Sequence, residues 1–187
     1  MPAQTTRDSS ELADILLSRD KIHLIGIDGF DGSGKTFLAG RLAKTLSARH
    51  INLDDFLNDN ESGFLNHLRY EELQAAANEA LAAGRVIVEG DCLRAVLGRI
   101  GLAADSHVYV KQVSADGSWH RADFLNLADS VEETLAIEQE SAERFEECRG
   151  NIVEPGKNLI TGLRRDLITY HFHYRPHECA DLIFERE

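Results

Sequence analysis

The sequence lacks long hydrophobic runs and contains few cysteines. No apolar stretch approaches the roughly 18 residues that a helix needs to cross a bilayer, and the first residues, MPAQTTRDSS, lack the apolar centre of a secretory signal. These two absences predict a cytoplasmic protein. The three cysteines, Cys92, Cys148 and Cys179, are odd in number and widely spaced, with no C-x-x-C pair. They therefore predict reduced thiols rather than a disulfide framework or a four-cysteine zinc site.

Length and composition predict one folded domain over residues 1–187. This length corresponds to about 1.2 domains of ordinary size. Apolar residues make up 43% of the chain and charged residues 28%, proportions that exclude a disordered, collagen-like or membrane-embedded chain.

The net charge of the chain is strongly negative. Thirty-two acidic residues against twenty basic ones give a net charge of −12, whereas a general nucleic-acid binder needs a broad cationic face. Electrostatic fields fade over about 8 Å at physiological salt, so a few placed cations and backbone N–H groups can still hold a phosphate. We therefore expect no nucleic-acid partner, while a nucleotide ligand stays open.

Apolar runs typical of strands alternate with segments typical of helices. Branched apolar runs predict strands at residues 21–28, 50–53, 85–89, 107–113 and 180–184. Helical spacing of apolar residues predicts helices at residues 9–18, 35–48, 70–83, 130–148 and 158–174. We expect Ser9 or Ser10 to cap the first helix and Ser130 with Glu133 to form a capping box. The alternation predicts an α/β fold with a central, mostly parallel sheet covered on both faces.

The most specific motif lies between the first predicted strand and the next helix. Residues 29–36 read GFDGSGKT and match the phosphate-loop pattern G-x-x-x-x-G-K-[ST]. Glycines let the backbone approach a ligand closely, so consecutive N–H groups can point at phosphate oxygens, and the helix N-terminus adds positive potential. Lys35 is expected to reach the β- and γ-phosphates and the Thr36 hydroxyl to bind Mg²⁺. The alternative is a glycine-rich turn that only links strand to helix.

The expected ATP- and phosphate-binding residues are Gly29, Gly32, Ser33, Gly34, Lys35, Thr36 and Phe37.

Two adjacent carboxylates, Asp54 and Asp55, follow the second predicted strand. Ligands of parallel sheets bind at the carboxyl ends of the strands. One aspartate could accept the proton of a substrate hydroxyl that attacks the γ-phosphate, and the other could hold Mg²⁺. The alternative is that the aspartates cap the following turn.

A third acidic position ends the predicted strand at residues 85–89. The sequence VIVEG places Glu89 directly after an apolar run, as in a Walker B segment, where a carboxylate orients metal-bound water. We therefore expect Thr36, Glu89 and Asp55 as candidate Mg²⁺ ligands. The alternative is an exposed glutamate that merely ends a strand.

Together these motifs resemble the P-loop kinases of the uridine kinase and phosphoribulokinase group. Shared features are the phosphate loop, an Asp-x-Phe segment at residues 54–56, the Glu-Gly pair at residues 89–90 and an Ala-Asp-hydrophobic strand at residues 180–184. The resemblance implies a P-loop NTPase-type three-layer α/β/α fold, with ATP and Mg²⁺ as cofactors. It also implies Asp54 as the catalytic base, Lys35 as a catalytic cation and a lid at about 114–165.

The chain departs from this group in two places. A Pro-x-Tyr-Asp insertion of the group's uridine kinases is missing before the Glu-Gly strand, so uridine itself is not the expected substrate. The Arg-Gly-Arg pattern of the lid is also missing; Arg164 and Arg165 are the candidate lid arginines, with ordinary surface cations as the alternative.

These features predict an ATP-dependent kinase that transfers the γ-phosphate to a hydroxyl of a nucleoside-like or other small metabolite. The expected partner is this small molecule, and neither a nucleic acid nor a membrane. Two alternatives stay open. One is a nucleotide-binding switch or slow NTPase without phosphotransfer; the other is a nucleoside monophosphate kinase, because residues 28–35 also resemble thymidylate kinases.

Overall fold

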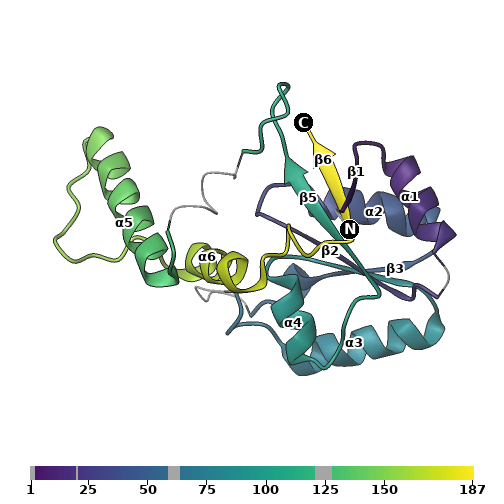
Figure 1. Ribbon diagram of the computed structural model, residues 1–187. Coiled ribbons are helices and arrows are strands. Elements are labelled where there is room, and N and C mark those ends of the chain that lie inside the picture. The colour runs from purple at the N-terminus through teal and green to yellow at the C-terminus, as the bar shows by residue number, and fades with distance from the viewer. Residues whose placement is uncertain (1–2, 20, 59–63, 121–127) are drawn as a thin grey trace.

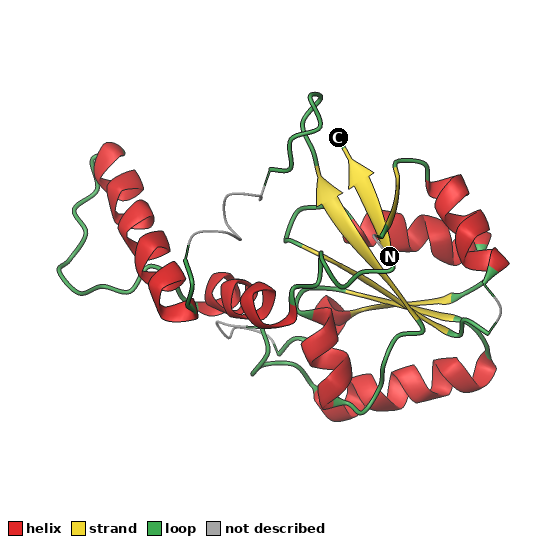
Figure 2. Cartoon of the chain, viewed as in Figure 1, coloured by secondary structure: helices red, strands yellow, loops and turns green. Residues whose placement is uncertain are grey.

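The computed structural model describes residues 3–19, 21–58, 64–120 and 128–187. In these ranges the chain forms one six-stranded sheet with helices on both faces (Figures 1 and 2). The strands are β1 (Gln4–Thr6), β2 (Leu24–Gly29), β3 (Arg49–Asn52), β4 (Val86–Glu89), β5 (Ser106–Gln112) and β6 (Leu182–Arg186). The helices are α1 (Ser9–Ser18), α2 (Lys35–Thr45), α3 (Tyr70–Ala83), α4 (Leu93–Arg99), α5 (Val131–Cys148) and α6 (Gly162–Tyr174), with a 3₁₀ turn, η1 (Leu53–Phe56).

All strand pairs in the sheet are parallel, in the order β1-β6-β5-β2-β4-β3. The strand before the phosphate loop, β2, is therefore central and pairs with β4 on one side and β5 on the other. Because every strand runs the same way, all carboxyl ends meet at one edge of the sheet, where α/β proteins bind their ligands. The predicted α/β fold with a parallel sheet covered on both faces is confirmed.

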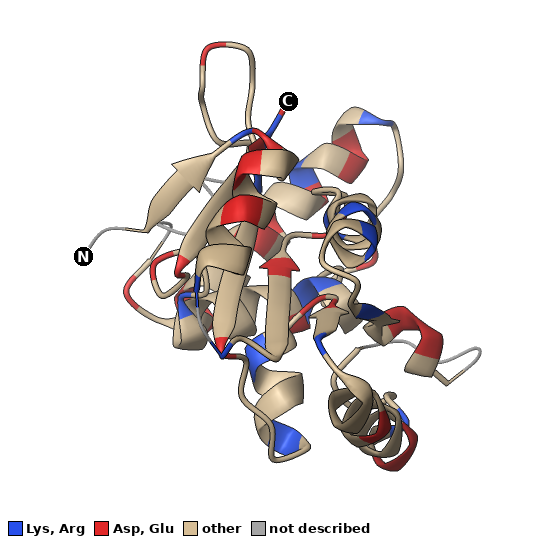
Figure 3. Ribbon diagram, turned by 90° about the vertical axis from the view of Figure 1, so that its right-hand side faces the viewer, with Lys and Arg blue, Asp and Glu red and all other residues tan. Residues whose placement is uncertain are grey.

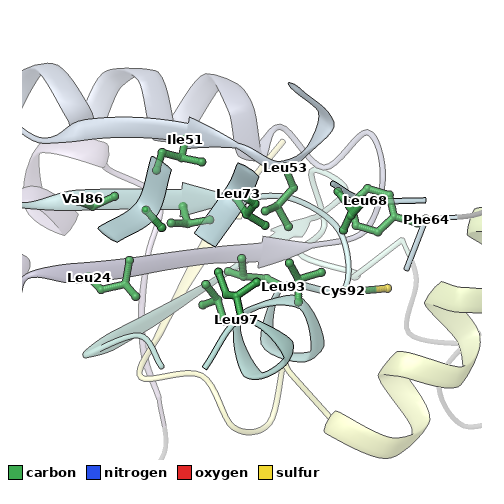
Figure 4. Packing of buried hydrophobic residues seen from close by; sticks show 14 of the residues in the cluster. Leu24, Ile51, Leu53, Phe64, Leu68, Leu73, Val86, Cys92, Leu93 and Leu97 are labelled. Atoms are coloured by element: carbon green, nitrogen blue, oxygen red, sulfur yellow. The ribbon is translucent and has the colours of Figure 1, made fainter. Parts of the chain in front are cut away.

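Two hydrophobic cores hold the helices against the sheet. Side chains alternate between the faces of a strand. Ile25 and Ile27 of β2 pack with Leu12 of α1 and Leu38 of α2 on one face. On the other face lie α3, α4 and part of α6. Figure 4 shows Leu73 of α3 and Leu93 and Leu97 of α4 within this cluster. Because β2 is packed on both faces, its position in the sheet is fixed. The position of the loop that follows it is fixed as well.

Most predicted elements are observed within a few residues of their expected bounds. One cap differs, because Asp8 and not Ser9 or Ser10 caps α1, accepting a hydrogen bond from Ser10 N at 2.7 Å. The capping hydrogen bond from Glu133 N to Ser130 Oγ is present at 3.1 Å.

The last predicted helix was placed too early, since α6 begins at Gly162 rather than near Asn158. The Gln139 side chain of α5 accepts the backbone N–H groups of Leu159 and Ile160. A partner distant in sequence therefore satisfies this backbone without a helix. Two short elements, β1 and α4, were not predicted. They have three and seven residues, which is too short to show a clear periodicity.

One part of the structure lies away from the sheet. Figure 1 shows α5 projecting outward and joined to the body through α6. This arm falls inside the segment expected as a lid, of which residues 121–127 lie outside the described ranges. No helix in the described ranges has the length and apolar character to span a membrane.

Candidate active site

The phosphate loop opens into a pocket of about 240 Å³ at the carboxyl edge of the sheet. Three strands contribute to it, because β2 leads into the loop, β4 into residues 89–91 and β3 into η1. The lining residues are Asp31, Gly32, Gly34, Lys35, Thr36, Asp54, Glu89, Gly90 and Asp91. The tertiary structure thus brings together three segments predicted separately from the sequence.

The loop leaves the first backbone N–H groups of α2 without a side-chain cap. The N-cap position of α2 is Gly34, which has no side chain to satisfy the first amides of the helix. Ser33 is buried, and its Oγ has no hydrogen-bond partner in the part of the chain that the structure describes. Buried polar atoms without partners are costly. An anion bound at this helix N-terminus would accept hydrogen bonds from the uncapped N–H groups, so the loop fits a phosphate.

Lys35 is held between two oxygen atoms. Its Nζ donates to the Phe30 carbonyl at 3.0 Å and to Asp91 Oδ1 at 2.8 Å. The side chains of Lys35 and Asp91 are both only 8% exposed, so solvent screens the pair weakly. Burial raises the pKa of Asp91, and the charge of Lys35 opposes this rise. Without a ligand, the charge of Lys35 is therefore balanced by Asp91.

Asp91 is a site residue that the sequence analysis missed. It lies two positions after Glu89 in the run Glu-Gly-Asp. Gly90 turns the chain here, and a side chain at this position would collide with Leu53, whose Cβ would be 2.6 Å away. The acidic residue after the Glu-Gly pair was the available signal, but sequence spacing does not show that it meets Lys35.

The adjacent residues Asp54 and Asp55 line different pockets. Asp54 lines the phosphate-loop pocket, whereas Asp55 lines a second pocket of about 270 Å³ between β3, η1 and α3. The cap of η1 is Asn52, whose side chain accepts a hydrogen bond from Asp54 N at 3.0 Å. Desolvation raises the pKa of Asp54, and the charges of Asp91 and Glu89 raise it further. The structure therefore groups Asp54, and not Asp55, with Lys35.

Glu89 is buried at the end of β4, with an exposed fraction of 1%. Its Oε1 has no hydrogen-bond partner among the described residues, although His50 Nε2 lies 3.4 Å away. Because Glu89 also lines the phosphate-loop pocket, its carboxylate could hold a cation or metal-bound water there. Glu89 thus lies where the Walker B comparison predicts it.

The charges in the pocket indicate that a nucleotide would enter with a cation. Four carboxylates, from Asp31, Asp54, Glu89 and Asp91, face a single lysine there. A triphosphate alone would be repelled, whereas Mg²⁺ neutralises phosphate charge and accepts oxygen ligands. No group of three His, Cys, Asp or Glu side chains within the described ranges is arranged to hold a metal ion by itself. Thr36 and Glu89 both line the pocket and could hold Mg²⁺ together with phosphate oxygens and water.

Acidic and basic residues are interspersed on the ribbon as seen in Figure 3.

Helix α6 packs directly against the phosphate loop. Tyr170 donates its hydroxyl proton to Asp28 Oδ2, and the same hydroxyl accepts from Arg94 N at 3.1 Å. The ring of the next residue, His171, stacks on Phe30 with a centroid distance of 4.1 Å and an interplanar angle of 4°. Helix α6, which follows the α5 arm in the chain, thus contacts both Asp28 at the end of β2 and Phe30 in the phosphate loop.

The hydrogen bonds of His171 define its tautomer. Nδ1 lies 2.9 Å from the Leu167 carbonyl, which can only accept, so Nδ1 carries the proton and Nε2 accepts from the Tyr109 hydroxyl at 2.9 Å. Burial lowers the pKa of His171 to about 4. The imidazole is therefore neutral at physiological pH and acts as a packing group beneath the loop.

Asp28 is a buried carboxyl group directly before the phosphate loop. Desolvation raises its pKa to about 7, against the opposing hydrogen bonds from Tyr170 and from Gly29 N at 2.7 Å. Its proton is thus bound more tightly in the folded protein than in the unfolded chain.

We expect Asp28→Asn to change how stability depends on pH. Between about pH 4 and 7 the folded state holds one more proton at Asp28 than the unfolded state, so this group lowers the unfolding free energy as pH rises. The shift corresponds to roughly 4 kcal/mol across that window. Urea unfolding of the wild type and of Asp28→Asn at several pH values gives the difference between their unfolding free energies. Buried histidines such as His171 contribute with the opposite sign, but equally in both proteins, so their contribution cancels in this difference. A constant difference from pH 4 to 7 would contradict the assignment.

The two candidate lid arginines lie outside the phosphate-loop pocket. Arg164 Nη2 pairs with Glu138 Oε2 of α5 at 2.6 Å, and this contact joins the two helices. Arg165 is exposed on α6. Phosphate contacts by these arginines stay predictions.

Helix α6 also reaches the segment that follows η1. Asp166 accepts the backbone N–H groups of Phe64 and Leu65 at 3.0 and 3.2 Å. One helix therefore contacts the phosphate loop, the arm and the chain beyond Asp54.

The parallel sheet with helices on both faces and the phosphate loop after its central strand define a P-loop NTPase-type three-layer α/β/α fold. Among solved structures, the chain is similar to a possible uridine kinase from Bacillus stearothermophilus, with a TM-score of 0.54, 15% identity, and coverage of 94% of this chain and 96% of that one. It also matches the shikimate kinase from Bacteroides thetaiotaomicron, with a TM-score of 0.36, 14% identity, and coverage of 88% and 86%. At 15% identity, the similarity to the possible uridine kinase shows a shared fold. No protein-family model and no curated protein matches the sequence.

Proposed function

We propose that this protein is an ATP-dependent kinase that transfers the γ-phosphate to a hydroxyl group of a small molecule. The observation that carries the proposal is the meeting of Lys35, Asp54 and Glu89 in one phosphate-loop pocket. A phosphate-binding loop alone suits many nucleotide-binding proteins. A carboxylate with a raised pKa beside it suits a base that accepts a proton during transfer.

The chain's own residues have distinct roles in this proposal. Backbone N–H groups of residues 32–36 bind phosphate oxygens, and Lys35 exchanges Asp91 for the β- and γ-phosphates. Asp54 accepts the proton of the attacking hydroxyl, while Thr36 and Glu89 hold Mg²⁺ and its water. Bound Mg²⁺ would neutralise charge on the transferring phosphate.

Fold similarity and sequence together support a proposal for the acceptor class. The similar structure is described as a possible uridine kinase, which supports a nucleoside-like acceptor. The missing Pro-x-Tyr-Asp element argues for an acceptor other than uridine. We therefore propose a nucleoside-like or other small hydroxyl metabolite.

The test is ATP consumption by the wild-type protein with a panel of nucleosides, sugars, vitamin-like alcohols and nucleoside monophosphates. We expect ADP formation that depends on one acceptor class and on Mg²⁺, with product phosphorylation confirmed by mass spectrometry. Asp54→Asn is the matched control for contaminating kinases. ATP binding without transfer to any acceptor would instead indicate a nucleotide switch, and transfer to a monophosphate would indicate a nucleoside monophosphate kinase.

A further inference from the structure

An arginine outside the predicted site, Arg186, lies against the phosphate loop. It is the last residue of β6, whose carboxyl end shares the sheet edge with the loop. A methyl group added at Gly34 would lie 3.0 Å from both Cδ and Cζ of Arg186 and still closer to Nη1. Gly34 also has φ of +95°, which glycine adopts readily. Glycine at this position thus permits both the loop conformation and the approach of the guanidinium group.

The strand pattern explains why Arg186 reaches the loop. Leu182 and Phe184 of β6 face the core formed with α1 and α2. Side chains two apart on a strand share a face, so Arg186 continues this row toward α2, just beyond the buried part. Its guanidinium carbon lies 5.8 Å from the ring centroid of Phe37, a residue of α2 that is 62% exposed.

Arg186 has no carboxylate partner among the described residues. The neighbouring Glu185 and Glu187 both pair with Arg7, at 3.0 and 3.2 Å. Lys35 is paired with Asp91 and Arg164 with Glu138. Within the described ranges, no carboxylate pairs with the charge of Arg186. The neighbouring phosphate-loop pocket, by contrast, is rich in carboxylates.

The order of strands shows which part of a nucleotide Arg186 would meet. Asp54 follows β3 and Glu89 ends β4, both on one side of β2, whereas β6 lies beyond β5 on the opposite side. Phosphate transfer takes place next to Asp54, so the γ-phosphate belongs on that side. A nucleotide with its γ-phosphate there can extend its nucleoside and α-phosphate toward Arg186 and Phe37 on the opposite side of β2.

We propose that Arg186 is a nucleotide-binding residue that holds the half shared by ATP and ADP, with its guanidinium on the α-phosphate and Phe37 against the base. This inference rests on the proposed function, since it assumes that the loop binds a nucleotide. A guanidinium group suits this role because it donates several hydrogen bonds to phosphate and also packs on aromatic faces. The Phe37 ring has the guanidinium carbons of both Arg41 and Arg186 at 5.8 Å from its centroid, and a planar base takes the place of the Arg186 guanidinium when that group moves to the phosphate.

The experiment is calorimetric titration of Mg·ADP and Mg·ATP into the wild-type protein, Arg186→Ala, Arg186→Lys and the control Arg144→Ala. Arg144 is an exposed arginine on α5 that pairs with Glu140, so its loss changes net charge equally. We expect Arg186→Ala to weaken the binding of both nucleotides by the same factor, about 10- to 100-fold. Arg186→Lys should recover part of the affinity, and the difference from wild type should shrink at high salt.

Two results would overturn the role of Arg186. One is wild-type affinity of Arg186→Ala for ADP, and the other is weakening of ATP alone, which would place the contact at the γ-phosphate. Absence of nucleotide binding by the wild-type protein would contradict the proposed function itself and this inference with it. Circular dichroism of each variant separates loss of binding from loss of folding.

Discussion

Replacing Asp54 by Asn is expected to lower kcat by about 10²- to 10⁴-fold while ATP binding is largely retained. Asparagine has nearly the same shape but cannot accept the proton of an attacking hydroxyl. Asp54 shares the pocket with Lys35 and Glu89, and its raised pKa reflects desolvation and the nearby acidic charges. Turnover with the identified acceptor and ATP titration by calorimetry measure the two effects separately.

The neighbouring residue supplies a matched control for this prediction. Asp55→Asn makes the same chemical change one position away, in a side chain that lines the second pocket, and we expect turnover near the wild-type rate. The pH profile of kcat adds a further readout, because an essential carboxylate with a raised pKa places the acid limb above the usual range of aspartate. A larger loss for Asp55→Asn than for Asp54→Asn would reverse the two roles.

Replacing Lys35 by Ala is expected to abolish measurable phosphate transfer and to destabilise the protein. Loss of a cation that stabilises developing charge lowers kcat by about 10²- to 10³-fold, and weaker phosphate binding adds to this. Lys35 and Asp91 form a buried pair at 2.8 Å. Removing one partner of such a pair costs about 3–5 kcal/mol of unfolding free energy, because the other charge stays buried without compensation. Activity assays and urea unfolding measure the two losses.

The double variant Lys35→Met with Asp91→Asn separates these effects. It removes both charges and retains most of the side-chain volume, so we expect much of the stability to return while activity stays lost. If the single variant Lys35→Ala were as stable as the wild type, the pair would contribute nothing to folding. If the double variant regained activity, Lys35 would have no direct part in transfer.

Local sequence patterns predicted the elements that carry the site. The run at residues 86–88 is apolar, and β4 is buried at all four of its positions. The helix predicted over residues 70–83 is observed with the same bounds and ends at Gly84. These patterns succeed because burial on both faces of a parallel strand and helical spacing of apolar residues are local properties of the chain.

The pairing of charged side chains was not predictable in the same way. Asp91 lies 56 positions from Lys35 and Asp28 lies 142 positions from Tyr170, yet both pairs form buried hydrogen bonds. Arg186 is the last residue of a strand whose other members are mostly apolar, and only the strand order shows that this strand ends near the loop. Contacts between side chains far apart in sequence depend on strand order and on helix docking, which no local pattern encodes.

By itself, the sequence determined the parallel α/β class, the phosphate loop and the acidic ends of two strands, because backbone preferences and burial act over short stretches of chain. Only the tertiary structure decided that Asp54 rather than Asp55 shares the loop's pocket, that Asp91 balances Lys35 and that Arg186 lies against Gly34. Each of these depends on which strands are neighbours in the sheet and on the direction in which a side chain leaves its strand or turn.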